Sequence, residues 1–202
     1  MTAIYNSKKR KVAADRNHYL LLRTAMDLFA EKGYHRTTLD EISARANLSK
    51  GTIYNHFKDK KDLFISVIDW GDHQLSHQLH DTIKRCADAR EVIERTLLAY
   101  FKFFEKRNAF FKVLVQEKYN LRPEVQSQFL KTYLNNIADL EVVIRDGIRK
   151  GTLRDIDPYI GAVMITGMAN IMVFNWMHTD SKLRIIDLYN HAADLIKHGM
   201  YN

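Results

Sequence analysis

Apolar residues recur every three or four positions along almost the whole chain of 202 residues. That spacing places them on one side of an α-helix, whereas a half-buried strand would alternate apolar and polar residues. Only two prolines and eight glycines are available to interrupt the helices, and no segment has the pattern of paired strands. The sequence therefore predicts an all-α protein, and its 46% hydrophobic and 27% charged residues are typical of a globular one.

Long helices are predicted in the second part of the chain. The two prolines, at positions 123 and 158, can each open a helix, because proline fits the first turn. The expected segments are Arg90 to Lys106, Pro123 to near Gly151, Pro158 to His178 and Arg184 to His198.

The segment from Tyr159 to His178 contains no Asp, Glu, Lys or Arg. A membrane-spanning helix needs ~20 mostly apolar residues, so a membrane span is one interpretation. Asn170 and Asn175 interrupt the apolar run, and the charges at its two ends lack the asymmetry of a spanning helix. We therefore interpret the segment as a buried helix that must be covered on every side, and we expect no membrane contact.

Two short helices, over residues 38–46 and 49–57, are predicted after a longer helix from His18 to Lys32. Thr38 and Glu41 have the spacing of a capping box, which satisfies free backbone N–H groups where a helix starts. A short turn at Asn47-Leu48 separates the two short helices. This is the helix-turn-helix arrangement, whose second helix enters the major groove of DNA.

The second short helix has a thin apolar seam formed by Ile53 and Phe57. A recognition helix needs only such a seam, because it rests on the other helices and presents its remaining surface to DNA. Polar, basic and small residues fill that surface, where they can approach base edges or donate hydrogen bonds to phosphates. The predicted DNA-binding residues are Lys50, Gly51, Thr52 and Asn55 toward the bases, Thr38, Tyr54, His56 and Lys60 toward the phosphates, and the capping Ser49.

Nearly all of the excess positive charge lies in the first third of the chain. Residues 1–60 contain twelve Lys and Arg against six Asp and Glu, and the remaining residues contain nineteen against eighteen. Such a local excess favours a polyanionic partner, either nucleic acid or a membrane surface. Residues 1–15 are expected to form a basic flexible arm, whose run Lys8-Lys9-Arg10-Lys11 fits a solvated tail, an arm along nucleic acid or a nuclear-import signal.

The run FAEKGYHRTTLDEISARANLSKGTIYNHFKDKKDLF resembles the DNA-binding domain of the tetracycline-repressor (TetR) family, over a match from Arg16 to Ile65. Asn47-Leu48 departs from the family, which commonly has a glycine and a β-branched residue in this turn. The resemblance implies an all-helical homodimer that pairs through its last two helices. Each subunit would place one recognition helix on a palindromic double-stranded DNA operator, and a bound small molecule would release it. The implied domains are the arm 1–15, the DNA-binding domain 16–65 with its motif at about 39–58, and an effector-binding and dimerisation domain 66–202.

Aromatic and methionine stripes in the second domain are candidates for an effector cavity, although such stripes are more often plain core. The candidate pocket residues are Phe101, Phe104, Phe111, Met164, Met168, Met172 and Trp176. Together they favour an apolar or amphipathic small molecule. The pattern GTLRDIDPY…GMANIMVFNWM is similar to that of fatty-acid-responsive members of the family, so a fatty-acyl thioester such as an acyl-CoA is one candidate.

Three histidines, His73, His77 and His80, share one helical face, which either binds a metal or forms an exposed polar surface. We expect the polar surface and neither metal nor cofactor, with His73 and His77 as the candidate ligands otherwise. No glycine-rich phosphate loop, nucleophile elbow or carboxylate pair stands out, so no enzyme activity is expected. The single cysteine, Cys86, and an N-terminus without an apolar signal core fit a cytoplasmic protein.

Two classes of function follow from these patterns. The first is a ligand-responsive, DNA-binding transcriptional regulator, most simply a repressor. The second is a helical small-molecule carrier or sensor dimer that does not bind DNA. Selection from random oligonucleotides discriminates between them, because a carrier enriches no palindrome.

Overall fold

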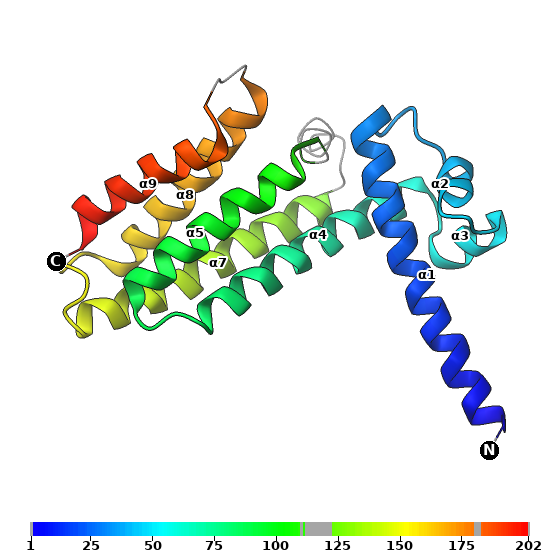
Figure 1. The fold of residues 1–202 in the computed structure, drawn as a ribbon, viewed down its shortest axis with the longest axis horizontal. Helices are drawn as coiled ribbons and strands as arrows, with labels where there is room; N and C mark the ends of the chain where they lie inside the picture. The colour runs from blue at the N-terminus through cyan, green and yellow to red at the C-terminus, as the bar shows by residue number, and fades with distance from the viewer. Residues whose placement is uncertain (1, 110, 112–122, 180–182, 202) are drawn as a thin grey trace. The chain divides into compact units, whose positions relative to one another are not determined.

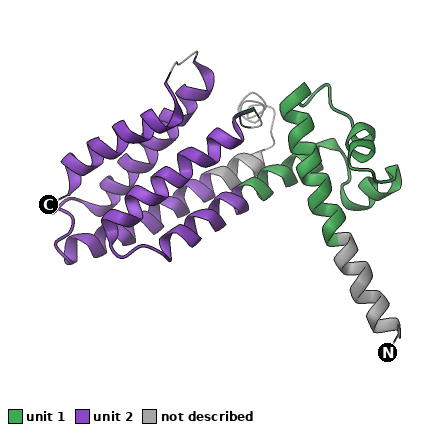
Figure 2. Ribbon diagram, viewed as in Figure 1, with its two compact units in different colours: residues 1–71, 109–119 green, residues 72–108, 120–202 purple. Residues whose placement is uncertain are grey.

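The computed structural model describes the backbone of residues 2–109, 111, 123–179 and 183–201, and the side chains of residues 15–109, 111, 130–179 and 183–201. Within these ranges every regular element is a helix, and the one β-type pairing is an isolated bridge between Leu153 and Tyr201. The all-α prediction is therefore confirmed (Figure 1). The chain forms two compact units: an N-terminal unit of residues 1–71 and 109–119, and a C-terminal unit of residues 72–108 and 120–202 (Figure 2).

Four helices build the N-terminal unit: α1 (Thr2–Lys32), α2 (Leu39–Arg45), α3 (Lys50–His56) and the first part of α4 (Lys60–Ile83). Their apolar residues, spaced by one helical turn, meet in a single core. Phe29 of α1 and Phe64 of α4 lie at its centre, with ring centroids 5.1 Å apart in an edge-to-face arrangement. The other apolar side chains of this core that are 0% exposed are Leu21, Ala25, Ile42, Ile53, Leu63 and Val67.

The turn between α2 and α3 explains the Asn47-Leu48 departure from the family pattern. Asn47 has a φ of 53°, a left-handed conformation that asparagine tolerates better than most residues. The backbone N–H of Asn47 donates to the Ala44 carbonyl, and that of Leu48 donates to the Ser43 carbonyl. These two bonds form a Schellman motif, which closes the end of α2. Asparagine can therefore replace glycine here without changing the turn.

Helix α1 begins at Thr2, so residues 2–15 continue the helical backbone, whereas the sequence analysis expected a flexible arm. The physical reason lies in the composition of this stretch. No glycine or proline occurs before Gly33, and alanine, lysine and arginine, which are good helix formers, are frequent. The side chains of residues 2–14, including the Lys8–Lys11 run, lie outside the described ones.

The C-terminal unit contains the rest of α4 together with α5 (Ala89–Lys106), α7 (Pro123–Arg149), α8 (Pro158–His178) and α9 (Ile185–Met200). Helix α7 packs along α8, and α5 packs along α9 and α7 (Figure 1). The predicted segments thus form helices, and the two prolines stand at the first positions of α7 and α8.

The end of α7 approaches α5 closely at Gly147. A Cβ atom built at Gly147 would lie 2.6 Å from the Cβ of Ala89 and 2.7 Å from Leu153. Arg90 donates from its Nε to the Thr152 carbonyl at 2.7 Å, and the Tyr201 hydroxyl donates to the Arg90 carbonyl at 3.3 Å. These contacts join the start of α5 to the end of α7 and to the end of α9.

Helix α8 is long and apolar enough to cross a membrane, but the core helix of a soluble protein has the same properties. Only 33% of its most apolar window is buried, so the prediction of cover on every side is not met within one chain. Four of its exposed apolar residues follow one helical stripe, namely Ile160, Met164, Ile171 and Phe174, whereas Tyr159 is exposed at the start of the helix outside this stripe. Gly167 lies on the same stripe, and a Cβ atom there would meet nothing within 4 Å.

Candidate nucleic-acid interface and effector cavity

Helix α3 is anchored through two residues and exposes most of the others. Ile53 and Phe57 are 0% and 2% exposed, which confirms them as the apolar seam. Gly51 and Asn55 are exposed, and Tyr54 keeps 50% of its surface accessible. A seven-residue helix gains little stability from its own backbone, so burial of the seam on the neighbouring helices is what fixes its polar surface in place.

Capping side chains fix the starts of both short helices. Thr38 Oγ1 accepts from the Glu41 N–H at 3.2 Å, and Glu41 Oε2 accepts from the Thr38 N–H at 3.1 Å, which is the predicted capping box. Ser49 Oγ accepts from the Thr52 N–H at 3.2 Å and lies 2.8 Å from Thr52 Oγ1. Thr38 and Ser49 therefore define where α2 and α3 begin, and both remain exposed at the surface.

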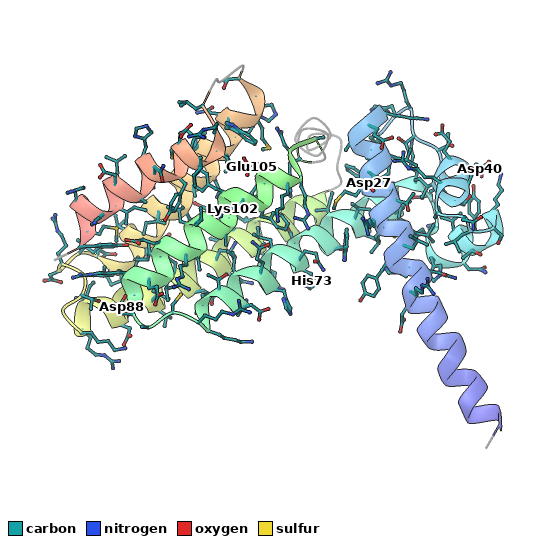
Figure 3. The ribbon with its side chains drawn as sticks, in the orientation of Figure 1. Asp27, Asp40, His73, Asp88, Lys102 and Glu105 are labelled. Carbon is teal, nitrogen blue, oxygen red and sulfur yellow. The ribbon has the colours of Figure 1, made fainter. Side chains whose placement is uncertain are left out.

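Lys50 lies at the start of α3 and pairs with Asp40 of α2, which is labelled in Figure 3. Its Nζ atom is 2.7 Å from Asp40 Oδ2, and both side chains are more than half exposed. The hydrogen bond to Asp40 raises the pKa of Lys50, so this side chain stays charged. Because an exposed ion pair is worth little, Lys50 can exchange the carboxylate for a DNA acceptor at small cost.

Lys60 has a different environment from the one predicted. Its Nζ atom donates to the carbonyl oxygens of Tyr34, His35 and Thr37 at 3.0, 3.2 and 3.0 Å. The ammonium also lies 4.5 Å from the centre of the Tyr34 ring. An ammonium group has three N–H donors, and all three are used within the protein. These contacts assign Lys60 to fixing the α1–α2 loop, and its role as a phosphate donor stays a prediction.

His56 closes α3 and lies beside His18 of α1, with ring centroids 5.5 Å apart. The His18 ring stacks on Phe57 at 5.0 Å. Burial lowers the pKa of His18, and the neighbouring His56 lowers it further, while Asp15 acts in the opposite direction. The end of α3 therefore rests on an imidazole that favours its neutral form.

The C-terminal unit contains a cavity of about 130 Å³. Helices α4, α5, α7 and α8 line it, mainly with apolar side chains. Tyr100 of α5 lies in its wall and donates a hydrogen bond from its hydroxyl to Asn170 Oδ1 of α8. Burial raises the pKa of Tyr100, and the charge of Asp72 raises it further, so the phenol stays neutral. An apolar cavity with a few fixed polar groups is the usual form of a small-molecule site.

Comparison with known proteins identifies the family. Residues 21–67 match the family described as bacterial regulatory proteins, tetR family, and residues 86–200 match the tetracyclin repressor-like C-terminal domain. The chain belongs to the TetR family. It is therefore a ligand-responsive transcriptional regulator with a helix-turn-helix DNA-binding domain.

Individual TetR-family relatives cover nearly the whole chain. The fatty acid metabolism regulator protein of Bacillus subtilis is 28% identical over 187 residues, which is 90% of this chain and 94% of the relative. A transcriptional regulator from Saccharomonospora viridis, solved in complex with choline, has a TM-score of 0.82 at 20% identity, covering 93% of this chain and 99% of its own. FadR from Bacillus subtilis, solved with stearoyl-CoA, has a TM-score of 0.75 at 24% identity, covering 88% and 96%.

The predicted pocket residues of this TetR-family chain do not line the cavity. Phe101 and Phe111 are buried elsewhere, and Met164 is 68% exposed. Trp176 donates from its indole N–H to the Leu183 carbonyl at 3.0 Å. The remaining three, Phe104, Met168 and Met172, are partly exposed and also lie outside the lining.

The actual lining comes from neighbouring positions on the same helices. It comprises Ser76, Leu79, His80, Ile83, Val92, Ile93, Thr96, Leu97, Tyr100, Asn136, Asp139, Leu140, Val143, Ile165, Thr166 and Ala169. Successive helical residues point about 100° apart, so Tyr100 and Phe101 face different directions. The sequence signal for this lining is the occurrence of the polar residues Tyr100 and Thr166 among apolar ones, which a pattern of aromatic and methionine stripes does not contain.

Two of the three histidines of α4 have separate partners. His77 Nδ1 lies 3.1 Å from Asp81 Oδ2, and His80 Nδ1 lies 2.9 Å from the Ser76 carbonyl. His73 is exposed on the same helix (Figure 3). Among the side chains that the structure describes, no three potential ligands come together around a common point. The candidate metal site at His73 and His77 therefore has no geometric support.

Proposed function

We propose that this TetR-family regulator is a repressor that binds a palindromic operator as a dimer and leaves it when an apolar or amphipathic effector enters the cavity. The DNA-binding part of the proposal rests on the two faces of α3, of which one is buried and the other is exposed. Ile53 faces the core, whereas Lys50, Gly51, Tyr54 and Asn55 are exposed. This is the surface that a recognition helix needs in the major groove. Such a regulator acts where the DNA is, so we expect a cytoplasmic protein.

The polar surface residues of α3, together with Thr38 at the start of α2, divide into two roles. Lys50, Thr52 and Asn55 carry the groups that discriminate between base edges, and Gly51 lets the backbone approach the duplex. Tyr54, His56 and Thr38 can donate to phosphates, which position the helix without reading sequence. Phosphate contacts also release counterions, so operator affinity should fall steeply with salt.

Selection from random double-stranded oligonucleotides tests this proposal. The wild-type protein should enrich a palindrome, and Asn55→Ala should change the enriched bases, because one good base contact contributes about 1–3 kcal/mol of discrimination. Tyr54→Phe should weaken binding to all sequences without changing the palindrome. Asn135→Ala, at an exposed position of α7, is the matched control. If no palindrome is enriched, the carrier interpretation replaces the regulator.

The dimer is proposed to form through the exposed stripe of α8 together with α9. Met164 and Phe174 are 68% and 42% exposed, and Leu195 of α9 is 66% exposed. A continuous apolar surface of this kind is unfavourable in water unless a partner covers it. The small Gly167, in the middle of the stripe, would allow two helices to approach closely.

Native mass spectrometry tests the dimer. Met164→Glu should convert the dimer to a monomer, because a carboxylate would be buried at the interface without a counter-charge. Leu134→Glu changes an exposed apolar residue of α7 in the same way and should leave the dimer intact. If both variants remain dimeric, the α8 stripe is not the interface.

The effector is proposed to be an amphipathic molecule of the fatty-acyl type. The support comes from the relative named as a fatty acid metabolism regulator, which aligns with 90% of this chain, and from the largely apolar cavity wall. A fatty-acyl thioester added to the protein–operator complex should release the DNA in a gel-shift titration. Release by coenzyme A alone would argue against recognition of the acyl part.

A further inference from the structure

We propose that the cavity of the C-terminal unit accepts the uncharged polar end of an amphipathic molecule, such as an ester, thioester or amide, and rejects the corresponding carboxylate. The inference rests on the proposed function, because it takes this cavity to be the effector site. It goes further by assigning the chemical class of the group that the site recognises and the residues that recognise it.

The first observation concerns charge. Among the described residues that line the cavity there is no lysine and no arginine, and Asp139 is the only acidic side chain. A carboxylate placed in this wall would lose its hydration without gaining a permanent cation. Asp139 is exposed and adds no positive charge that could offset this loss.

The second observation concerns the cations next to the cavity. A neighbouring groove shares Ile83, Val92 and Val143 with the cavity and contains the basic residues Arg145, Arg149 and Lys150. Each of them already has a carboxylate partner: Arg145 pairs with Glu141, and Arg149 and Lys150 both pair with Asp146. These three cations face the two carboxylates of Glu141 and Asp146, and Asp88 in the same groove supplies a third negative charge. The charges therefore balance, and the groove does not supply the missing counter-charge.

The third observation concerns uncharged donors. Asn136 of α7 and Thr166 of α8 line the cavity, and neither side chain makes a hydrogen bond within the described structure. The Tyr100 hydroxyl is oriented by Asn170, to which it donates. An amide N–H and a hydroxyl can both donate to a carbonyl oxygen, and the phenolic oxygen can accept from an amide N–H. These groups match a neutral carbonyl compound.

The lining also contains His80, and an imidazole becomes a cation when it is protonated. Its ring lies at an exposed position, with Nδ1 2.9 Å from the Ser76 carbonyl. A protonated imidazole in this position would be hydrated and would offset little of the cost of burying a carboxylate. His80→Gln should therefore leave the preference for the neutral compound unchanged.

Calorimetric titration of the full chain with three probes of equal chain length tests the proposal. The probes are octanoate, N-methyloctanamide and octyltrimethylammonium, which differ in the charge of the polar end. N-methyloctanamide should bind about ten-fold or more tightly than octanoate, because only octanoate buries an unpaired charge. Equal or tighter binding of octanoate overturns the proposal. Tighter binding of octyltrimethylammonium than of the amide also overturns it, since the site would then be cationic in its preference.

Asn136→Lys provides a gain-of-function test. A lysine in the wall would supply the missing cation, so the affinity for octanoate should rise about ten-fold and the preference should reverse. Asn135→Lys adds the same charge at the adjacent exposed position, outside the cavity lining, and should change neither affinity. Thr166→Val, which keeps the shape and removes a donor, should weaken amide binding several-fold. If Asn136→Lys folds and leaves octanoate binding unchanged, the charge argument is wrong.

The outcomes separate this inference from the proposed function. If the protein enriches a palindrome but binds none of the three probes, the DNA-binding proposal stands and the inference fails. If N-methyloctanamide binds with the expected preference but no palindrome is enriched, the inference stands and the chain is a carrier.

Discussion

The two units of this protein use their polar residues differently. In the N-terminal unit, polar side chains close short helices and fix loops, as the capping box of Thr38 and the three carbonyl contacts of Lys60 illustrate. In the C-terminal unit, Asp88 and Asp157 cap α5 and α8 in the same way, but other polar groups such as Asn136 and Thr166 line a cavity. The comparison indicates that the first unit is built to present one fixed surface, and the second to accept a ligand.

The largest expected effects come from the two aromatic cores. Phe29→Ala in the N-terminal unit and Phe101→Ala in the C-terminal unit each remove a ring that is 0% exposed. Each variant should lose about 3–5 kcal/mol of unfolding free energy, because a large cavity remains. Urea denaturation measures this loss, and Tyr19→Phe, at an exposed position, is the control.

Measurements of operator binding and of N-methyloctanamide binding should distinguish the two variants. Under conditions where both remain folded, Phe29→Ala should weaken operator binding while keeping N-methyloctanamide binding, because Phe29 lies in the unit that carries α3. If Phe29→Ala instead impairs both activities equally, the division of labour between the units does not hold.

Lys60→Met is the next largest change. It removes three hydrogen bonds from the loop carbonyls of Tyr34, His35 and Thr37 while keeping the aliphatic stem. Bonds from a charged donor contribute about 1.5–3 kcal/mol, so the variant should unfold at a lower urea concentration. Lys61→Met, at the next position, serves as the control. A Lys60→Met protein with wild-type stability and weak DNA binding would instead restore the phosphate role.

Thr38→Ala tests the capping of α2. Loss of an N-cap hydroxyl costs about 0.5–2 kcal/mol of stability, and here the capping box with Glu41 is lost with it. Asp157→Ala removes the N-cap of α8, whose side chain accepts from the Ile160 N–H at 2.9 Å, and should cost a similar amount. Gel shifts should detect weaker operator binding for Thr38→Ala than for Asp157→Ala, since only Thr38 borders the proposed DNA surface.

The smallest predicted effect is a pH dependence from His18. Its pKa in the folded protein lies below the ordinary value of 6.5, chiefly because of burial and then because of His56. As pH falls below 6.5, the unfolded chain binds the proton first, so this contribution to stability is present above 6.5 and is lost on acidification.

His18→Phe keeps a ring against Phe57 and removes the titrating group. The variant should therefore show a flatter dependence of unfolding free energy on pH between neutral and mildly acidic conditions. Thermal unfolding across this range measures the difference. An unchanged pH profile would assign the effect to another group.

Most features of the N-terminal unit could be predicted from the sequence. The capping box, the Ile53–Phe57 seam and the resemblance over Arg16 to Ile65 rest on spacings of a few residues, and the structure confirms the capping box and the seam. Even the Asn47 turn depends only on local backbone bonds. Local hydrogen bonds and helical periodicity are properties of neighbouring residues, so they can be read without knowing the fold.

Tertiary structure decided the rest. Lys60 bonds to carbonyls 23 to 26 residues away, and the cavity collects single residues from four helices. Which face of each helix meets the cavity depends on how the helices are rotated against one another, since adjacent residues such as Tyr100 and Phe101 differ by about 100°. Local spacing was enough to predict the helices, their caps and the recognition surface of α3. Packing between distant helices determined the role of Lys60, the lining of the cavity and its lack of a cation.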